Sequence, residues 1–451
     1  MEFLESIFQA GVVGCGGAGF PTHKKLDCRP EYLIINGAEC EPLLRTDRYV
    51  MRNLAVGVVE AAKRTAREIG ARECVIALKR AYTQEVRALE AAIGKERSVH
   101  LHLLDSFYPA GDEQTLVYEV TGRVVPPAGL PLEAGAVVQN VSTMLAVGQA
   151  LRGEAFTGRY LTVTGEVKSP CIVYAPLGTP ARECIALAGG AAVEDYILIA
   201  GGPMMGPVCG DIDNTFVTKT TSAYLVLKKS AHLAARHALT VRQMLTRARS
   251  ACIQCSYCTE LCPRYQLGHA IEPHRVMRTL AMHPDITTAL DLPAIRNAAL
   301  CCSCGICEEF ACPMQLSPRR MNEMVKRALA EAKMRYTRPE GVAYAPRPSR
   351  EYRKAPSKRV AARAGVLKYY DYEISDLRTA APARVSLPLR QHIGAPSVPC
   401  VGVGDAVTQG MRIAACPEGA LGANLHASIS GTVTAVTKDA ITIEAGGNAD
   451  V

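Results

Sequence analysis

The sequence predicts a multidomain α/β protein, and three observations support this fold class. Apolar strand-like runs alternate with helix-like segments over the first 150 residues, an order that favours a parallel sheet covered by helices. Two cysteine runs lie in a region of helical character, and the end of the chain is rich in Gly and Val with short strand-like runs. A length of 451 residues leaves room for about three domains.

The first domain is expected over residues 1–152. Short apolar runs suited to buried strands alternate with amphipathic segments, each of which ends at a glycine that can cap a helix. The expected strands cover residues 32–35, 73–78 and 99–104, and the expected helices cover residues 52–69 and 83–93.

The rest of the chain changes character four times. Residues 157–230 combine alternating strand-like runs with one short helix, which predicts a small mixed domain. Residues 232–336 are helical around the cysteines, and residues 337–384 form a basic, proline-containing linker. Residues 385–451 predict a small all-β module.

Composition narrows the class of protein. The chain is 48% hydrophobic and 21% charged, as is usual for a globular protein in water. It has no apolar run of roughly 20 residues that could span a membrane, and its acidic start lacks a secretory signal. We therefore expect a cytoplasmic protein, in which 18 cysteines indicate metal binding or catalysis rather than disulfides.

The net charge of +8 is concentrated in one segment. Residues 317–369 contain 15 Lys and Arg but 4 Asp and Glu, a net +11, which leaves −3 for the remainder. Such a segment is either a solvated linker or a docking surface for an acidic partner or a phosphate-bearing ligand. Nucleic-acid binding is not expected, because no recognised motif accompanies the charge.

The two cysteine runs carry the clearest chemistry. The first has the spacing C-x2-C-x2-C-x3-C-P, and the second has the same spacing with one extra residue before its last cysteine. This is the bacterial [4Fe–4S] pattern. Three thiolates at i, i+3 and i+6 can bind three irons of a cube from one loop, and the proline turns the fourth cysteine away.

In two-cluster ferredoxins, the fourth cysteine of each run binds the other cluster. The first cluster is accordingly assigned to Cys252, Cys255, Cys258 and Cys312, and the second to Cys301, Cys304, Cys307 and Cys262. The alternative is structural zinc in CxxC pairs, which explains neither the third cysteine nor the repeated Cys-Pro. Cys302 is too close to Cys304 to fit the spacing and is interpreted as a spectator.

A glycine-rich stretch near the N-terminus formally matches G-x-G-x-x-G, with Gly14, Gly16, Gly17 and Gly19. By itself this match is weak, because no convincing strand precedes it and Pro21 follows. It is either a phosphate-binding loop or an ordinary glycine-rich turn.

The glycine stretch gains meaning from three later segments. These are Asn36-Gly-Ala-Glu39-Cys-Glu41-Pro, then Tyr108-Pro-Ala-Gly111-Asp112-Glu113, and then Gln139-Asn140-Val-Ser-Thr143. Together they resemble the flavin- and NADH-binding subunit of respiratory complex I. The resemblance is closer to the RnfC component of the Rnf complex and to the cobalamin reductases of propanediol-utilisation microcompartments, and it covers essentially the whole chain.

The resemblance implies four domains in order: a Rossmann-like α/β flavin domain, a β-grasp (SLBB) domain, a helical di-cluster ferredoxin domain and a barrel-sandwich hybrid module. It implies that the glycine loop lies against FMN. It further implies that the flavin and NADH contacts come from Lys25, Asn36, Glu39, Glu41, Tyr108 as a stacking ring, Gly111, Asp112, Glu113, Asn140 and Thr143. Ala38 replaces an aspartate of the complex I pattern, and Gln139 replaces an asparagine.

The function implied is an oxidoreductase that moves electrons from NADH through FMN and two [4Fe–4S] clusters to a corrinoid cobalt. A corrinoid or an adenosyltransferase is the implied acceptor, with a microcompartment shell protein as a further partner and a location within or at that compartment. Two alternatives stay open: a component of an Rnf-type ferredoxin:NAD complex, or a non-catalytic iron–sulfur relay docked to a shell. The C-terminal position of the hybrid module favours the reductase branch over the Rnf component.

Overall fold

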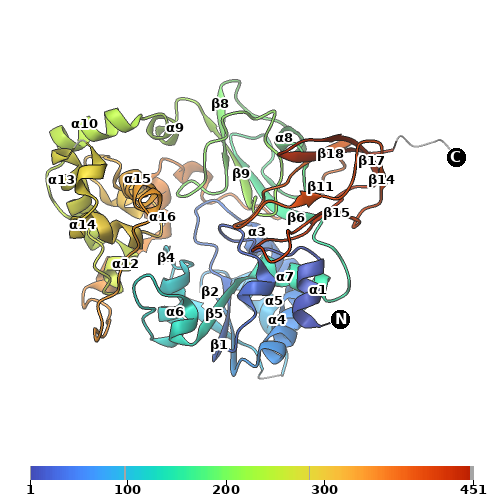
Figure 1. Ribbon diagram of the computed structural model, residues 1–451, viewed down its shortest axis with the longest axis horizontal. Helices are drawn as coiled ribbons and strands as arrows, with labels where there is room; N and C mark the ends of the chain where they lie inside the picture. Colours follow the sequence, from blue (N-terminus) through green and yellow to red (C-terminus); the bar gives the residue numbers. More distant parts are fainter. Residues whose placement is uncertain (1, 96–97, 284, 447–451) are drawn as a thin grey trace.

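The computed structural model describes residues 2–95, 98–283 and 285–446. Figure 1 shows four structured regions in chain order, with the helical region on one side of the molecule and the C-terminal strands on the other. Within the described residues, no helix is both long and apolar enough to cross a bilayer.

The N-terminal domain is built on a parallel four-stranded sheet with the order β3-β2-β1-β5. Its elements are α1 (Phe3–Gln9), α2 (Thr22–Lys25), β1 (Tyr32–Gly37), α3 (Thr46–Asn53), α4 (Ala55–Ile69), β2 (Glu73–Lys79), α5 (Thr83–Ile93), β3 (His100–Leu104), β4 (Phe107–Tyr108), α6 (Glu113–Thr121), η1 (Pro131–Ala134), β5 (Ala136–Asn140) and α7 (Val141–Ala150).

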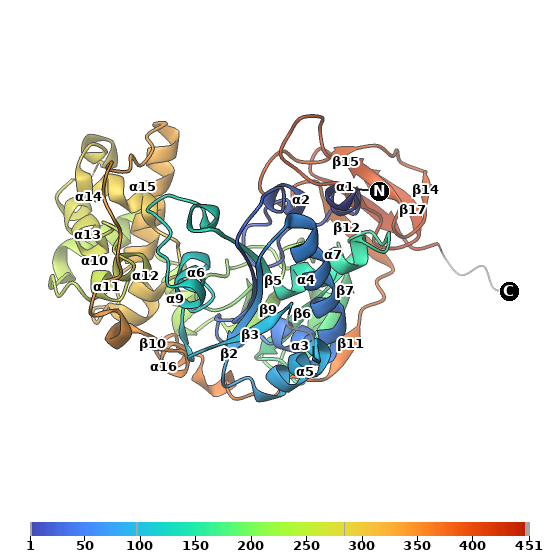
Figure 2. The same cartoon turned by 90° about the horizontal axis from the view of Figure 1, so that it is seen from below.

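Both faces of this sheet are buried, as expected for parallel strands flanked by helices. Leu33 and Ile35 of β1 pack with α4 and α7 in one hydrophobic cluster. Ile34, between them in the sequence, packs with α6 on the other face, because successive side chains of a strand alternate. Figure 2 shows α4, α5 and α7 on one side of the sheet and α6 on the other. The loops at the carboxyl ends of the strands are therefore left to form a site.

The second domain is a mixed sheet with the order β11-β7-β6-β9-β8. Strand β6 pairs antiparallel with β7 and parallel with β9, and α8 packs on this sheet. Its elements are β6 (Gly158–Gly165), β7 (Cys171–Pro176), α8 (Ala181–Leu187), β8 (Tyr196–Ala200) and β9 (Ala223–Lys228), completed by β11 (Leu377–Thr379) from much later in the chain.

The third region consists of short helices around the two cysteine runs. Helices α10 and α15 each pack against α13, over buried residues such as Met277 and Val325. The elements are α9 (His232–His237), α10 (Val241–Ala251), α11 (Tyr257–Glu260), α12 (Pro263–Gln266), α13 (Pro273–Met282), η2 (Ile286–Ala289), α14 (Pro293–Arg296), η3 (Asn297–Leu300), the π-helical turn η4 (Ile306–Ala311) and α15 (Pro318–Glu331).

The segment expected to be a basic linker, residues 337–384, is packed in part against the other domains. It contains η5 (Arg350–Arg353), β10 (Ala355–Pro356), α16 (Ser357–Arg363), η6 (Leu367–Tyr369) and β11. Strand β10 pairs with β4 of the N-terminal domain, and Val360 and Ala361 of α16 are buried.

Several cations of this segment bind carboxylates of the same chain. Arg350 and Lys354 both contact Glu119, at 2.5 and 3.1 Å, and Lys368 contacts Glu166 at 2.5 Å. The segment therefore uses much of its positive charge to hold the chain's own domains together.

The C-terminal module has two small sheets, β12-β18-β17-β14 and β13-β15-β16. Its strands are β12 (Arg384–Pro388), β13 (Val398–Pro399), β14 (Ala406–Val407), β15 (Arg412–Ala415), β16 (Leu425–His426), β17 (Gly431–Val436) and β18 (Ala440–Glu444). Residues such as Val385 and Ile443 share one hydrophobic core with Leu161 and Val173 of the second domain. These observations confirm the predicted multidomain α/β fold class.

Candidate functional site

The glycine stretch forms an open loop between α1 and α2. Its two ends are held by hydrogen bonds from Gly14 N to the Phe20 carbonyl (3.0 Å) and from Thr22 N to the Val12 carbonyl (3.1 Å). Residues 16–18 between them are exposed. At Gly17, a Cβ would meet nothing within 4 Å. An exposed backbone with free space in front of it suits the phosphate end of a flavin nucleotide.

Two glycines of this loop are needed for close approach. A Cβ on Gly16 would lie 3.1 Å from the Asn140 side chain, and one on Gly19 would lie 2.9 Å from Thr220 and 3.1 Å from the Cα of His392. The loop is thus pressed between the end of β5, the second domain and the C-terminal module.

Asn140 and Thr143 fix this loop from the carboxyl end of β5. The side-chain oxygen Oδ1 of Asn140 caps α7 by accepting hydrogen bonds from Ser142 N (2.9 Å) and Thr143 N (3.3 Å), and its side-chain amide donates to Asp47 (2.6 Å). The Thr143 hydroxyl accepts from Cys15 N at 2.9 Å. Asn140 and Thr143 thus help to hold the glycine loop in place. Asp47 bonds to Asn140 and Ser142 in the same network, and it was not expected from the sequence.

The loops after β1 and β4 meet through Asn36. Its amide donates to the Gly111 carbonyl (2.9 Å), and its side-chain oxygen accepts from Ala38 N (3.1 Å). A Cβ on Gly111 would lie 3.3 Å from Asn36, Ala38 and Cys40, so only glycine fits comfortably. Lys25 adds a further link by an ion pair of 2.6 Å with Glu113. The structure therefore brings the four predicted segments to one edge of the sheet.

Two buried carboxyl groups lie behind these loops. Glu39 accepts hydrogen bonds from Asp47 N (2.8 Å) and Arg48 N (3.2 Å), and burial together with the nearby Asp47 raises its pKa to about 7. Glu41 accepts from Met204 N of the second domain (3.0 Å), and burial raises its pKa to about 7. Its other oxygen, Oε1, has no hydrogen-bond partner among the described residues. That oxygen can accept a bond from a ligand without breaking the contact to Met204.

Tyr108 and Asp112 face the helical region instead of the glycine loop. Tyr108 is 1% exposed, and its hydroxyl donates to the carbonyl of Cys304. Asp112 caps α6 by accepting from Thr115 N (3.1 Å) and accepts two hydrogen bonds from the Arg264 guanidinium, at 2.5 and 2.9 Å. The loop after β4 therefore joins the N-terminal domain to the second cysteine run.

The first set of thiols lines one pocket. Cys252, Cys255 and Cys258 follow α10 directly and meet Cys312 there. The chain wraps around this space because Gln254 and Ser256 have positive φ values of 58° and 61°. Leu316 N donates to the Cys312 sulfur at 3.3 Å, a bond of the kind that stabilises cluster thiolates.

The second set of thiols is more deeply buried. Cys262, Cys304 and Cys307 are each 7% exposed, and Ser303 N donates to the Cys301 sulfur at 3.3 Å. Burial raises the pKa of Cys307 far above its usual value, and the neighbouring thiols Cys301, Cys258 and Cys262 raise it further. Crowded thiols of this kind become thiolates only next to a cationic centre, so the donor set fits an iron–sulfur cluster. Because Cys258 belongs to the first set, the two sets adjoin.

Cys302 lies among the same groups, close to Arg264 and Asp112. A hydrogen bond with the Cys304 side chain lowers the pKa of Cys302. Its position agrees with the spectator role expected from its spacing, but that role stays a prediction.

Besides Asp47, Arg264 and three arginines at and before α3 are polar residues of the site that were not expected from the sequence. Arg264 directly follows the Cys-Pro of the first run, and this unusual charge beside a cluster loop was the available signal. Arg45, Arg48 and Arg52 recur at three- and four-residue spacing, and Arg48 and Arg52 lie on α3, with Arg45 just before its first residue.

Four family models match consecutive parts of the chain. They are the Nuo51 FMN-binding domain (residues 7–149), the SLBB domain (residues 160–208), the 4Fe-4S dicluster domain (residues 251–317) and the RnfC barrel sandwich hybrid domain (residues 371–450). The chain therefore carries an FMN-binding domain and a dicluster iron–sulfur domain, and the predicted cofactors are confirmed at that level.

Similar proteins extend over nearly the full length. The cobalamin reductase PduS of Salmonella typhimurium is 43% identical over 446 residues, covering 99% of this chain and 97% of the relative. PduS of Citrobacter freundii is 41% identical over 441 residues, covering 97% and 95%. A component of the Na⁺-translocating ferredoxin:NAD⁺ oxidoreductase complex of Acetobacterium woodii is 36% identical over 264 residues, covering 57% and 56%.

Proposed function

Because this chain belongs to the family of the cobalamin reductase PduS, we propose that it uses FMN and two [4Fe–4S] clusters to pass electrons from NADH to the cobalt of a corrinoid. The observation that carries this proposal is the direct contact between the two halves of the site. The loop that brings Gly111 beside Asn36 also bonds, through Tyr108 and Asp112, to Cys304 and Arg264 of the cysteine runs.

The residues of the N-terminal domain would bind and orient the flavin. The exposed backbone of the glycine loop would receive the phosphate, and Lys25 would supply a positive charge beside it. Asn36 and Gly111 would contact the ring system, and the free oxygen of Glu41 would accept a hydrogen bond from NADH. When bound, FMN accepts a hydride and releases its two electrons one at a time.

The two cysteine sets would hold the clusters in the crossed arrangement. The grouping of Cys252, Cys255, Cys258 and Cys312 around one pocket supports the assignment of the first cluster. The proximity of Cys307 to both Cys262 and Cys258 supports a second cluster beside the first. Clusters so close would exchange electrons readily.

We further propose that the protein acts within or at a bacterial microcompartment. A corrinoid, free or held by an adenosyltransferase, would be the acceptor, and a shell protein would be a further partner. The reductase function is favoured over a role in an Rnf-type complex because similarity to PduS extends over 99% of the chain, whereas similarity to the Rnf-type relative extends over 57%.

The deciding experiment is an anaerobic titration with NADH of protein reconstituted with iron, sulfide and FMN. We expect about eight irons per chain, four in each cluster. NADH should bleach the flavin bands and then the broad absorbance of the clusters, and added cob(III)alamin should reoxidise both. A cluster-free Cys255→Ala/Cys304→Ala variant serves as the control, in which NADH should still bleach the flavin.

An unchanged spectrum would contradict the proposed use of NADH. If the irons and FMN bind but NADH leaves the spectrum unchanged, the NADH assignment is wrong. A non-catalytic relay, reduced by another electron carrier, would then be the function.

A further inference from the structure

A basic pocket lies beside the proposed electron path, at the carboxyl ends of β2 and β3. It has a volume of about 420 Å³, and the residues that line it include Lys79, Ser106, the arginines at positions 45, 48 and 52, and residues 370–375. Residues 14–19, 25 and 140–143 are not among those that line it, so it is separate from the glycine loop.

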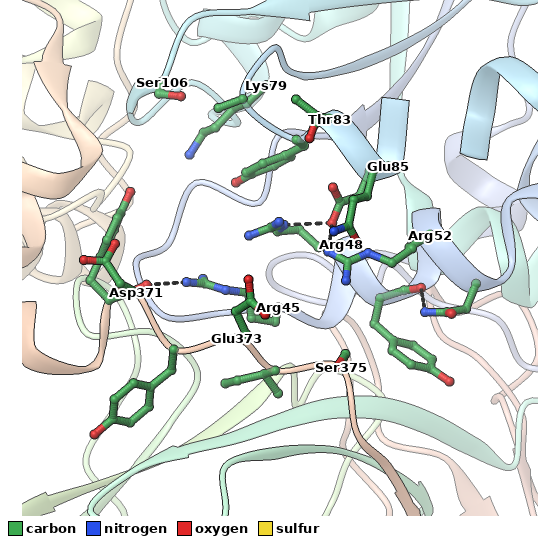
Figure 3. Close-up of a pocket in the computed structure, with 18 residues that line it drawn as sticks. Arg45, Arg48, Arg52, Lys79, Thr83, Glu85, Ser106, Asp371, Glu373 and Ser375 are labelled. Carbon is green, nitrogen blue, oxygen red and sulfur yellow. Dashed lines mark hydrogen bonds and ion pairs between the residues drawn. The ribbon is translucent and has the colours of Figure 1, made fainter. Parts of the chain in front are cut away.

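Three cations of this pocket converge on one space. Figure 3 shows the nitrogen atoms of Lys79, Arg45 and Arg48 directed toward the same opening from different elements. Arg48 and Arg52 share one carboxylate, Glu85, at 3.0 and 2.6 Å. Two guanidinium groups on one carboxylate leave a net positive charge on this wall.

The other two cations bond to neutral oxygens. Lys79 Nζ donates to the Ser357 hydroxyl (3.3 Å), and Arg45 donates to the carbonyls of Leu44 (2.7 Å) and Tyr370 (2.5 Å). Lys79 is 4% exposed, and burial lowers its pKa. Among the described residues, no carboxylate forms an ion pair with Lys79 or Arg45. A buried cation without such a partner is costly, and an anionic ligand would remove that cost.

The nearby acidic groups do not serve as anionic partners for Lys79 and Arg45. Asp371 at the rim pairs with Lys358 outside the pocket at 2.8 Å, and Glu373 is exposed at the rim. Glu39 lies behind the wall, with its carboxylate bound to backbone N–H groups of α3. The interior is thus left positive.

The remaining lining fits a phosphate ester better than a simple anion. Guanidinium groups match the geometry of phosphate oxygens, and Ser106, Thr83 and Ser375 add hydroxyls. Tyr82 and Tyr370 supply aromatic walls beside them. A volume of about 420 Å³ holds a phosphate and an attached sugar- or base-sized group.

The pocket also contacts both halves of the electron path. The Tyr82 hydroxyl donates to the carbonyls of Ala38 (3.2 Å) and Glu39 (3.3 Å), in the loop that follows β1. Tyr370 packs in the same hydrophobic cluster as Tyr108 and Cys304. A ligand held here would therefore lie next to both redox domains.

We propose that this pocket binds the phosphate group of a phosphate ester, with Lys79, Arg45 and Arg48 as its ligands. Two molecules carry such a group: a corrinoid with its nucleotide loop, which contains a phosphodiester, and a free nucleotide. The assignment of the pocket does not depend on the proposed reductase activity, because it predicts binding and not turnover.

The test is anaerobic equilibrium binding to the cluster-loaded protein, with cobalamin, cobinamide and ADP as probes. Cobinamide has the corrin ring without the nucleotide loop. We expect Lys79→Met and Arg45→Gln each to weaken binding of the phosphate-bearing probe at least about tenfold, and inorganic pyrophosphate to compete with it. Arg80→Met is the matched control, because it removes an exposed neighbouring cation that does not line the pocket.

The outcomes separate the two sources. Weaker cobalamin binding with unchanged cobinamide binding identifies the corrinoid phosphodiester, and weaker ADP binding identifies a nucleotide. If neither probe changes by more than about twofold relative to Arg80→Met, the proposal is overturned. Iron content and circular dichroism check the fold of each variant. If a buried variant fails to fold, binding to Arg52→Gln and pyrophosphate competition in the native protein replace it. Unchanged binding in Arg52→Gln together with no competition would then overturn the proposal.

Discussion

Lys219 is a buried cation at the junction of three domains. Its ammonium group donates to the carbonyls of Gly11 (2.7 Å) and Asn424 (2.6 Å), which belong to the N-terminal domain and the C-terminal module. Burial lowers its pKa to about 7. A neutral amine keeps two N–H donors, so both bonds persist after deprotonation.

The low pKa of Lys219 predicts a pH-dependent stability. The unfolded chain binds a proton at Lys219 up to about pH 10.5, whereas the folded chain releases it near pH 7. Stability therefore rises with pH between these values, by at most about 1.4 kcal/mol per pH unit. In anaerobic melts at pH 7, 8 and 9, the native protein should gain stability relative to Lys219→Met as pH rises.

Lys229→Met, at an exposed position of the same domain, provides the control and should give a difference that is independent of pH. A flat difference for Lys219→Met as well would show that Lys219 keeps its proton in the folded protein and would contradict the prediction.

Residue types were easier to predict than residue contacts. The grouping of Asn36, Gly111 and Lys25 at one edge agrees with the expected flavin loops. Asn36 lies near the end of β1, Gly111 follows β4, and Lys25 ends the short helix α2 that follows the glycine loop. The direction of Tyr108 and Asp112 was not predictable, because Arg264 is 152 positions from Asp112. Such a pairing depends on how two domains pack, and no local sequence pattern predicts it.

At the scale of elements, the two cysteine loops depend on backbone geometry that the spacing only implies. Gln254, Ser256 and Ser303 have φ values between 58° and 61°, and Gly305 follows at 80°. Residues in the left-handed backbone conformation turn the loop around a central space, and non-glycine residues adopt this conformation at a cost in free energy. The π-helical turn that carries Cys307 ends just before Cys312, which sends Cys312 back toward the first loop.

The crossed ligand assignment can be tested by comparing single and double variants. If Cys312 binds the first cluster, Cys255→Ala and Cys312→Ala damage the same cluster, and the double variant still retains about four irons. The measurement is iron content together with the electron paramagnetic resonance signal of the reduced protein.

An uncrossed arrangement would instead make the double variant lose both clusters. Cys302→Ala is the matched control and should keep about eight irons. A loss of iron in Cys302→Ala would show that Cys302 is a ligand and would contradict its assignment as a spectator.

The hydrophobic periodicity of the sequence predicts most helices and strands of the first domain, but it does not predict where a helix is broken. The expected helix over 52–69 is split at Leu54 into the end of α3 and all of α4. The composition of residues 337–384 predicts a basic linker, and its charge suits either a solvated segment or a docking surface. Its apolar residues, such as Val360 and Tyr369, are few, yet these two become buried against the other domains.

At the scale of the whole molecule, a small set of polar contacts, most of them buried, holds the regions around the cysteine runs together. Arg264 and Asp112 form a bidentate pair with 11% side-chain exposure on each side. The Tyr108 hydroxyl bonds to the Cys304 carbonyl nearby, and Arg363 of α16 donates to the Cys312 carbonyl at 3.2 Å. Electron transfer depends steeply on distance, so these contacts determine how well the two cofactor domains communicate.

Breaking the Arg264–Asp112 pair should therefore separate flavin reduction from cluster reduction. Arg264→Met leaves the Asp112 carboxylate buried without its cation, which costs about 3 kcal/mol or more at the domain contact. In stopped-flow mixing with NADH, we expect the flavin bands to bleach at the native rate and the cluster absorbance to bleach more slowly. The control is Arg353→Met, which removes the Arg353–Glu260 pair, exposed by 41% and 34%; such pairs contribute little. Equal slowing of both signals in Arg264→Met would mean that Arg264 supports the flavin site itself, and unchanged kinetics would mean that the pair does not position the two domains.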